Sequence, residues 1–188
     1  LPQLLRSPGE ARLQIALDFI NLRRAMRVAA AAVEGGADIL EVGTPLLKAE
    51  GLEAVRALKR EFPKIPVVAD LKTMDAGRIE MEAAAKAGAS IGTVLGAASP
   101  ATIRECIEAG LNYGLEIQVD LLGAPDPIEA AKRAEEYGAS IVGVHTPIDE
   151  QMEGRDPFEL LRRVRQEVAL PLSVAGGINS ETAGEAVK

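Results

Sequence analysis

The chain has 188 residues, of which 47% are hydrophobic, with 18 glycines, one cysteine, no tryptophan and a formal charge of −7. This length and apolar content predict a single domain over residues 1–188 with its own core. Because 28 acidic residues outnumber 21 basic ones, we expect no nucleic-acid partner. A lone cysteine closes no internal disulfide, which favours the cytoplasm. We expect no membrane role, because no apolar run reaches the roughly 18 residues of a bilayer span and residues 1–12 lack a signal-peptide core.

Short apolar, β-branched runs alternate with segments of helical period along the chain. The predicted strands are 13–18, 39–43, 66–72, 91–96, 116–123, 141–146 and 171–177, and the predicted helices include 23–33, 52–59, 78–87, 128–137 and 158–168. Residues 1–12 are predicted to be an N-terminal extension that packs on this domain. Helix starts are indicated by Ser99-Pro100, by Asp126-Pro127 with Glu129 and by Asp156-Pro157 with Glu159, and left-handed helix ends by Gly36, Gly88 and Gly138.

An internal repeat supports parallel strands joined by helices. The sequence Gly-Ala-Asp/Ser-Ile recurs at Gly36, Gly88 and Gly138, about two strand–helix units apart. The turn after the first strand has no glycine-rich dinucleotide fingerprint, which argues against an open doubly wound sheet. Polar residues gather at the C-terminal ends of the strands, as in a (β/α)₈ TIM barrel. Seven strands leave costly unpaired edges, so the eighth strand is expected to be missing from this chain, with an exchanged or altered closure as the alternative.

The densest polar cluster is Asp70-Leu71-Lys72-Thr73-Met74-Asp75. Residues 70 and 72 share a strand face, so a carboxylate and an ammonium are predicted to point into the barrel mouth, where each keeps the other ionised. The alternative for this pair is a buried structural ion pair. Asp75 lies beyond the strand, and a simple helix N-cap is its alternative role.

Glu41 stands in an otherwise apolar strand next to the one that carries Asp70. Two carboxylates from neighbouring strand ends, completed by water and substrate oxygens, suit Mg²⁺, and the residues alone leave Mn²⁺ open. Pairing of Glu41 with Lys72 is the structural alternative.

Three further features lie at the same end of the predicted barrel. His145, the one histidine, is a candidate general acid or base, although a lone histidine is often structural. Gly176-Gly177 is a candidate phosphate site, or only a turn. The polar segment Ile148–Asp156 is equally consistent with a lid and with an ordinary surface loop.

Cys106 has no candidate catalytic partner and is predicted to pack in a helix.

Four segments together resemble the orotidine 5′-monophosphate decarboxylase superfamily, and within it the 3-hexulose-6-phosphate synthases. They are Asp70-x-Lys72-x-x-Asp75, Leu40-Glu41-Val42-Gly43, His145-Thr146 and Val174-Ala175-Gly176-Gly177-Ile178. The resemblance, from about Leu13 to the end, implies a (β/α)₈ barrel that forms a homodimer with active sites at the interface. It also implies a phosphorylated sugar substrate and Mg²⁺-dependent aldol chemistry, which joins ribulose 5-phosphate to formaldehyde or reverses that step.

The resemblance also implies a role for each matching residue. It makes Glu41 and Asp70 metal ligands, Lys72 the group that helps stabilise a cis-enediolate, Asp75 a residue that reaches into the partner's site, Asp18 a substrate contact, His145 a proton carrier, and Gly176 with Gly177 a phosphate site. These roles are chemically coherent, because a divalent cation and an ammonium both stabilise the charge of an enediolate.

Two decarboxylase activities and a non-catalytic role are the alternatives. Orotidylate decarboxylases use no metal and usually have a lysine where Glu41 stands. The 3-keto-L-gulonate-6-phosphate decarboxylases have an arginine three residues after the histidine, where this chain has Ile148. Both differences favour the synthase activity. A silent barrel that serves as an assembly or regulatory module is disfavoured, because it gains nothing from clustered buried charges.

Overall fold

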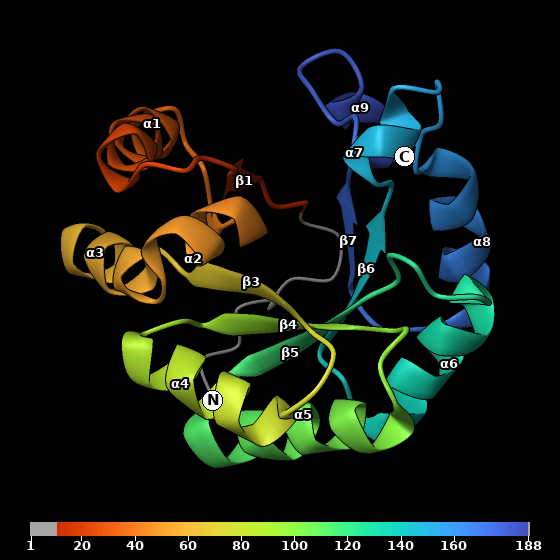
Figure 1. Cartoon of the computed structure of the whole chain (residues 1–188). Coiled ribbons are helices and arrows are strands. Elements are labelled where there is room, and N and C mark those ends of the chain that lie inside the picture. The colour runs from red at the N-terminus through yellow and green to blue at the C-terminus, as the bar shows by residue number, and fades with distance from the viewer. Residues whose placement is uncertain (1–10, 188) are drawn as a thin grey trace.

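A curled parallel sheet forms the centre of the computed structural model, which describes residues 11–187 (Figure 1). The strands pair in chain order, each parallel to the next. They are β1 (Gln14–Leu17), β2 (Ile39–Val42), β3 (Val67–Thr73), β4 (Ile91–Leu95), β5 (Glu116–Asp120), β6 (Ile141–His145) and β7 (Leu172–Ala175). All seven predicted strands are confirmed.

Most of the helices cover the outer, convex side of the sheet, and two short ones near the end of the chain lie beyond the ends of the last two strands (Figure 1). They are α1 (Leu22–Glu34), α2 (Thr44–Glu50), α3 (Glu53–Glu61), α4 (Gly77–Ala87), α5 (Pro100–Tyr113), α6 (Pro127–Tyr137), α7 (Ile148–Gln151), α8 (Phe158–Glu167) and α9 (Ala183–Ala186). The predicted helices are confirmed. The short helices α2 and α7 lie in segments where no helix is predicted, because fewer than two turns leave little periodicity.

Local signals explain where several helices begin and end. Ser99 caps α5 by accepting the Thr102 N–H, and Asp126 caps α6 by accepting the Glu129 N–H, both as predicted. Gly36, Gly88 and Gly138 adopt the predicted left-handed conformation, with φ of 93°, 97° and 88°. The expectation for Asp156-Pro157 needs one correction, because α8 begins one residue later, at Phe158. Asp156 accepts the Phe158 N–H at 2.9 Å and so forms a tight turn in place of the usual cap.

Strand alternation separates two apolar regions. Outward-facing side chains such as Leu40, Val94 and Val119 join the helices in the main core. Inward-facing Ile39, Val68, Ile91 and Ile141 form a second, smaller cluster inside the curled sheet. Two residues further along, the same inward faces carry Glu41, Asp70 and Thr93. The interior is therefore apolar at the N-terminal ends of these strands and polar at their C-terminal ends.

The sheet has the curvature of a TIM barrel and stops short of closure. Within residues 11–187, β1 and β7 pair on one side only, which agrees with the expected absence of an eighth strand. Residues 1–10 of the predicted N-terminal extension lie outside the described residues, and Ala11 and Arg12 are exposed. No helix in the described part of the chain is both long and apolar enough to cross a bilayer.

The prediction that Cys106 packs in a helix is confirmed. Its side chain is fully buried between α5 and α4. A Cβ placed on Gly77 would lie 2.6 Å from the Cys106 sulfur, so glycine at this position lets the two helices approach closely. Burial, followed by the charges of Glu80 and Glu105, raises the pKa of the thiol to about 12, which excludes a thiolate nucleophile at neutral pH.

Candidate active site

The polar side chains at the C-terminal ends of the strands form one cluster. Asp70 and Lys72 from β3 lie at its centre, and the Lys72 Nζ is 2.5 Å from the Asp70 Oδ2. Asp70 is 5% exposed, so this ion pair is shielded from water. The predicted meeting of a carboxylate and an ammonium at this end of the strands is confirmed.

Asp70 accepts hydrogen bonds on both carboxylate oxygens. The Thr93 hydroxyl on β4 donates to its Oδ1 at 2.9 Å. The Thr44 hydroxyl, in the first turn of α2, lies 2.8 Å from both its Oδ2 and its main-chain oxygen. With Lys72, these donors fix the rotation of the Asp70 carboxylate.

Lys72 reaches Asp70 in a different way from the simple alternation that the sequence predicts. Its φ is 48°, so the backbone leaves the pleat at this residue, and the pairing of β3 with β4 shifts between Ala69 and Thr73. A left-handed conformation costs a non-glycine residue about 1–2 kcal/mol. The kink allows the Lys72 side chain to contact the carboxylate two residues earlier. In a regular strand, side chains two residues apart point in the same direction and run parallel to each other.

Asp120, at the end of β5, connects Lys72 to His145. The Asp120 Oδ2 lies 3.6 Å from the Lys72 Nζ and 3.2 Å from the His145 Nδ1. An Nδ1–H donated to Asp120 leaves the His145 Nε2 as the proton acceptor of the ring. The sequence by itself assigns Asp120 no role. An acid at the C-terminal end of a predicted strand was the available sequence signal, and the structure leaves this side chain 2% exposed.

These carboxylates explain the charge state of the lysine. Burial by itself lowers the pKa of Lys72, but the charge and hydrogen bond of Asp70, with the charges of Asp120 and Glu41, raise it above its usual value. Lys72 is therefore an ammonium at physiological pH and cannot act as a neutral base.

Glu41 lies on β2 beside this ion pair. The Gln14 side-chain amide on β1 donates a hydrogen bond to its Oε2. Burial, followed by the charge of Asp70, raises the pKa of Glu41 to about 7, which the Gln14 hydrogen bond and the Lys72 charge only partly oppose. Among the described residues, Lys72 forms its ion pairs with Asp70 and Asp120, so direct pairing with Glu41 is not observed.

Asp18 follows β1 and joins the same electrostatic cluster. Burial and the charge of Asp70 raise its pKa, while Lys72 and His145 oppose the rise. Its carboxylate lies directly against Gly43, where a Cβ would be 2.0 Å from the Asp18 Oδ1. Gly43 has an ordinary φ of −63°, so the residue is required here by space and not by backbone conformation.

Asp75 lies outside this cluster. It is exposed in the loop after β3, and Ala76, with φ of 53°, occupies the N-cap position of α4 without a side-chain hydrogen bond. The alternative role of Asp75 as a helix cap is therefore wrong, because the left-handed Ala76 separates it from the helix.

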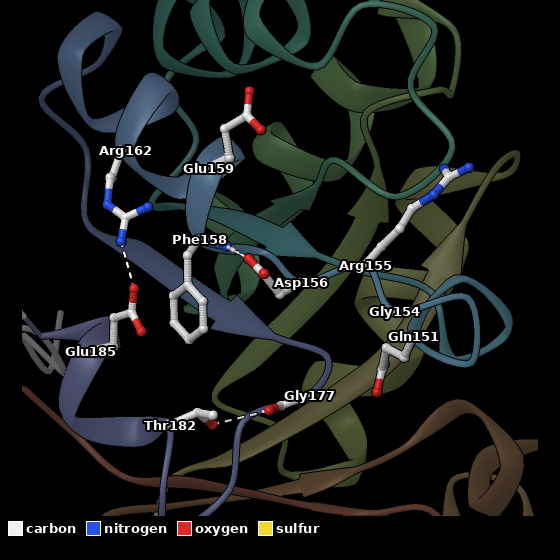
Figure 2. A pocket seen from close by; sticks show the side chains of 10 residues that line it. All are labelled: Gln151, Gly154, Arg155, Asp156, Phe158, Glu159, Arg162, Gly177, Thr182 and Glu185. Carbon is white, nitrogen blue, oxygen red and sulfur yellow. Dashed lines mark hydrogen bonds and ion pairs between the residues drawn. The ribbon is translucent and has the colours of Figure 1, made fainter.

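Gly176 and Gly177 form a left-handed turn at the end of β7, with φ of 91° and 74°. A Cβ on Gly176 would lie 2.3 Å from the Thr146 main-chain oxygen, so this turn admits no side chain. Gly177 lines a cavity of about 620 Å³ between α8 and α9 (Figure 2). The cavity is separate from the Asp70–Lys72 ion pair, neither residue of which lines it.

The segment Ile148–Asp156 covers part of this cavity. Residues 148–151 form α7, and the Gln151 amide donates to the Thr146 main-chain oxygen at 2.8 Å, next to the Gly176 turn. Gln151, Gly154, Arg155 and Asp156 all line the cavity (Figure 2). The segment is therefore anchored beside the candidate phosphate site, and its movement as a lid stays a prediction.

The donor set fits a hard divalent cation with few protein ligands. Across residues 11–187, no three histidine, cysteine or acidic side chains converge into a ready-made metal site. Two carboxylates completed by water and substrate oxygens is the pattern typical of Mg²⁺. Burial, and after it the charge of Asp70, raises the pKa values of Glu41 and Asp18, and a bound cation would favour the ionised form of both carboxylates.

Comparisons with known proteins identify the family of this chain. The chain is 40% identical over 176 residues to 3-hexulose-6-phosphate synthase of Methylomonas aminofaciens, which covers 93% of this chain and 84% of the relative. The structure of 3-hexulose-6-phosphate synthase from Salmonella typhimurium superposes with a TM-score of 0.89 at 38% identity, covering 93% of this chain and 83% of that one. The structure of 3-keto-L-gulonate-6-phosphate decarboxylase from Vibrio cholerae superposes with a TM-score of 0.84 at 33% identity. The match covers 94% of this chain and 83% of that one. These relatives are enzymes, and through its match over residues 11–188 the chain belongs to the orotidine 5′-phosphate decarboxylase / HUMPS family.

Proposed function

We propose that this enzyme catalyses the aldol condensation of ribulose 5-phosphate with formaldehyde to 3-hexulose 6-phosphate, or the reverse cleavage. The observation that carries the proposal is the Lys72 ammonium, held 2.5 Å from Asp70 and 3.6 Å from Asp120 in a buried acidic cluster. A fixed cation at this position is suited to stabilise a sugar-derived anion. The relatives named 3-hexulose-6-phosphate synthase support the same chemistry.

The reaction requires a proton to leave C1 of the ketose, so that C1 can form a bond to the formaldehyde carbon while the aldehyde oxygen gains a proton. Lys72 stabilises the enediolate oxygens, and His145, oriented by Asp120 at 3.2 Å, transfers a proton. Asp18 contacts the substrate, and the Gly176-Gly177 turn binds its phosphate. Glu41 and Asp70 would hold Mg²⁺, which would supply Lewis-acid stabilisation of the developing negative charge.

The decisive assay mixes the protein with ribulose 5-phosphate, formaldehyde and Mg²⁺ and measures the loss of formaldehyde. Consumption that depends on both substrates supports the proposal. Release of carbon dioxide from 3-keto-L-gulonate 6-phosphate, without formaldehyde consumption, would instead assign the activity of the Vibrio cholerae relative. If neither formaldehyde nor 3-keto-L-gulonate 6-phosphate is consumed, the result would favour a non-catalytic barrel.

A tight contact at Gly43 yields a specific prediction. Gly43→Ala should displace the Asp18 carboxylate and lower kcat/KM by on the order of 10- to 100-fold, because misplaced substrate contacts are costly. Gly184→Ala is the matched control, since a Cβ there meets nothing within 4 Å. Steady-state kinetics and thermal unfolding of both variants provide the check. Equal kcat/KM in the two variants would show that the Asp18 position does not matter.

We further propose a homodimer in which Asp75 completes the active site of the other subunit. Asp75 is exposed, and the apolar side chains of Met74 and Ile79 on either side of it are 51% and 70% exposed. Exposed apolar groups around a charged residue are typical of an interface. This arrangement accounts for an acid that does not join the cluster of its own subunit.

Subunit mixing tests the dimer. Asp75→Ala and Lys72→Ala should each be inactive, while equal mixtures that exchange subunits should recover about a quarter of wild-type activity. Half of the dimers are then mixed, and each has one intact site. Activity is measured after co-refolding, with each variant co-refolded alone as the control. If native mass spectrometry shows mixed dimers but activity is not recovered, Asp75 acts in its own subunit and not in the active site of the partner.

A further inference from the structure

The kink at Lys72 requires something to hold it. In the described part of the chain, Lys72 and Ala76 are the two non-glycine residues with positive φ. Val68 pairs with Ile91 and Ala69 with Gly92, but the next pair joins Thr73 to Val94. Residues 70–72 therefore lie opposite Thr93 alone, where the regular ladder is interrupted. Side chains of the surroundings must replace the missing main-chain hydrogen bonds.

The Thr44 hydroxyl supplies one replacement, at the Asp70 main-chain oxygen, and Thr93 supplies the one at the Lys72 N–H. The Thr93 Oγ1 accepts the main-chain N–H of Lys72 at 2.9 Å. The same Oγ1 donates to the Asp70 Oδ1, also at 2.9 Å. Because a threonine hydroxyl has one proton, accepting from Lys72 leaves that proton to point toward Asp70. One group thus fixes both the kinked backbone and the carboxylate.

The position of Thr93 excludes a direct role in the chemistry. The residue is 1% exposed and lies behind Asp70, whose Oδ2 is the oxygen that contacts Lys72 and Thr44. Replacement by valine would preserve the shape of the side chain but leave a buried N–H and a buried carboxylate oxygen without this partner.

We infer that Thr93 is a positioning residue, which holds Lys72 in its left-handed conformation and aims Asp70 for the reaction. It acts through these two residues and does not touch the substrate. The kinetic part of this inference rests on the proposed function, whereas its structural part does not.

Three variants test the inference. Thr93→Val removes both hydrogen bonds, Thr93→Ser retains the hydroxyl, and Thr102→Val removes another buried hydroxyl, 3.0 Å from that of Ser99 at the start of α5. We expect Thr93→Val to lower kcat by about 10- to 100-fold with little change in KM for ribulose 5-phosphate. Thr93→Ser should stay within about threefold of wild type. Thr102→Val should lose stability without a change in kcat.

Two measurements do not depend on turnover. Amide hydrogen exchange at Lys72, followed by NMR in the metal-free protein, should be at least about tenfold faster in Thr93→Val than in Thr102→Val. The affinity for Mn²⁺ without substrate, measured by electron paramagnetic resonance, should fall by about tenfold in Thr93→Val. If Lys72 exchange and Mn²⁺ affinity match the Thr102→Val control, Thr93 has only a structural role. If the wild-type protein shows no turnover, the proposed function fails, and these two measurements still decide the role of Thr93.

Discussion

Lys72→Ala is expected to lower kcat for the proposed condensation by about 10³-fold, because in the proposed mechanism its ammonium stabilises the developing enediolate. Lys72 stays charged through its contacts with Asp70 and Asp120, so its stabilising effect is present across the neutral pH range. Its 2.5 Å contact to Asp70 is partly buried, and the electrostatic effect of a charge is stronger in this environment than in water. Stopped assays of formaldehyde consumption, with saturating sugar phosphate, measure the loss.

The same substitution should destabilise the protein. Removal of Lys72 leaves Asp70 and Asp120, 5% and 2% exposed, without their nearest cation, at a cost of about 3 kcal/mol in the free energy of unfolding. Mg²⁺ should restore part of this stability without restoring kcat. The control is Lys132→Ala, which breaks an exposed ion pair with Glu167 on the protein surface and should leave both quantities close to wild type. Near-normal kcat in Lys72→Ala would remove the ammonium from the mechanism.

Chelation of divalent cations is expected to abolish turnover, and added Mg²⁺ to restore it. The requirement should depend on pH, since the pKa of Glu41 in the metal-free protein is raised to about 7. Below this pH the carboxyl is protonated and competes poorly for the cation, so the apparent Mg²⁺ affinity should fall by up to about tenfold per pH unit. Above pH 7 the affinity should level off. Mg²⁺ titrations of the initial rate at pH 6, 7 and 8 measure this dependence.

Glu41→Gln provides the matched control for the metal. It should weaken Mg²⁺ binding at pH 8 and remove the fall in affinity between pH 7 and pH 6. The metal-free wild-type protein should also lose stability as the pH rises from about 5 to 8, because the folded state binds a proton at Glu41 more tightly than the unfolded state does. That trend should be weaker in Glu41→Gln, in which the raised pKa of Asp18 still contributes to it. Full activity in the presence of chelator would exclude Glu41 and Asp70 as metal ligands.

Some of the candidate site residues can be predicted from the sequence of one strand at a time, and others cannot. Glu41, Asp70 and His145 were predictable as site residues, since each is a polar residue on the inward face at the C-terminal end of an apolar strand. Asp120 also ends a strand on the inward face, yet its contact with Lys72 depends on how β3 and β5 are arranged on either side of β4. No sequence periodicity reports a distance between strands that are not adjacent.

The sequence by itself determined the strand–helix order, most helix ends and the face that carries the charged groups, because strand period, caps and left-handed glycines are properties of neighbouring residues. Only the tertiary structure decided the kink at Lys72 and the hydrogen bonds of Thr93, since both arise where β3 slips against β4. It also decided that α7 packs beside the Gly176 turn. These features depend on contacts between segments far apart in the chain, which form only when the sheet curls.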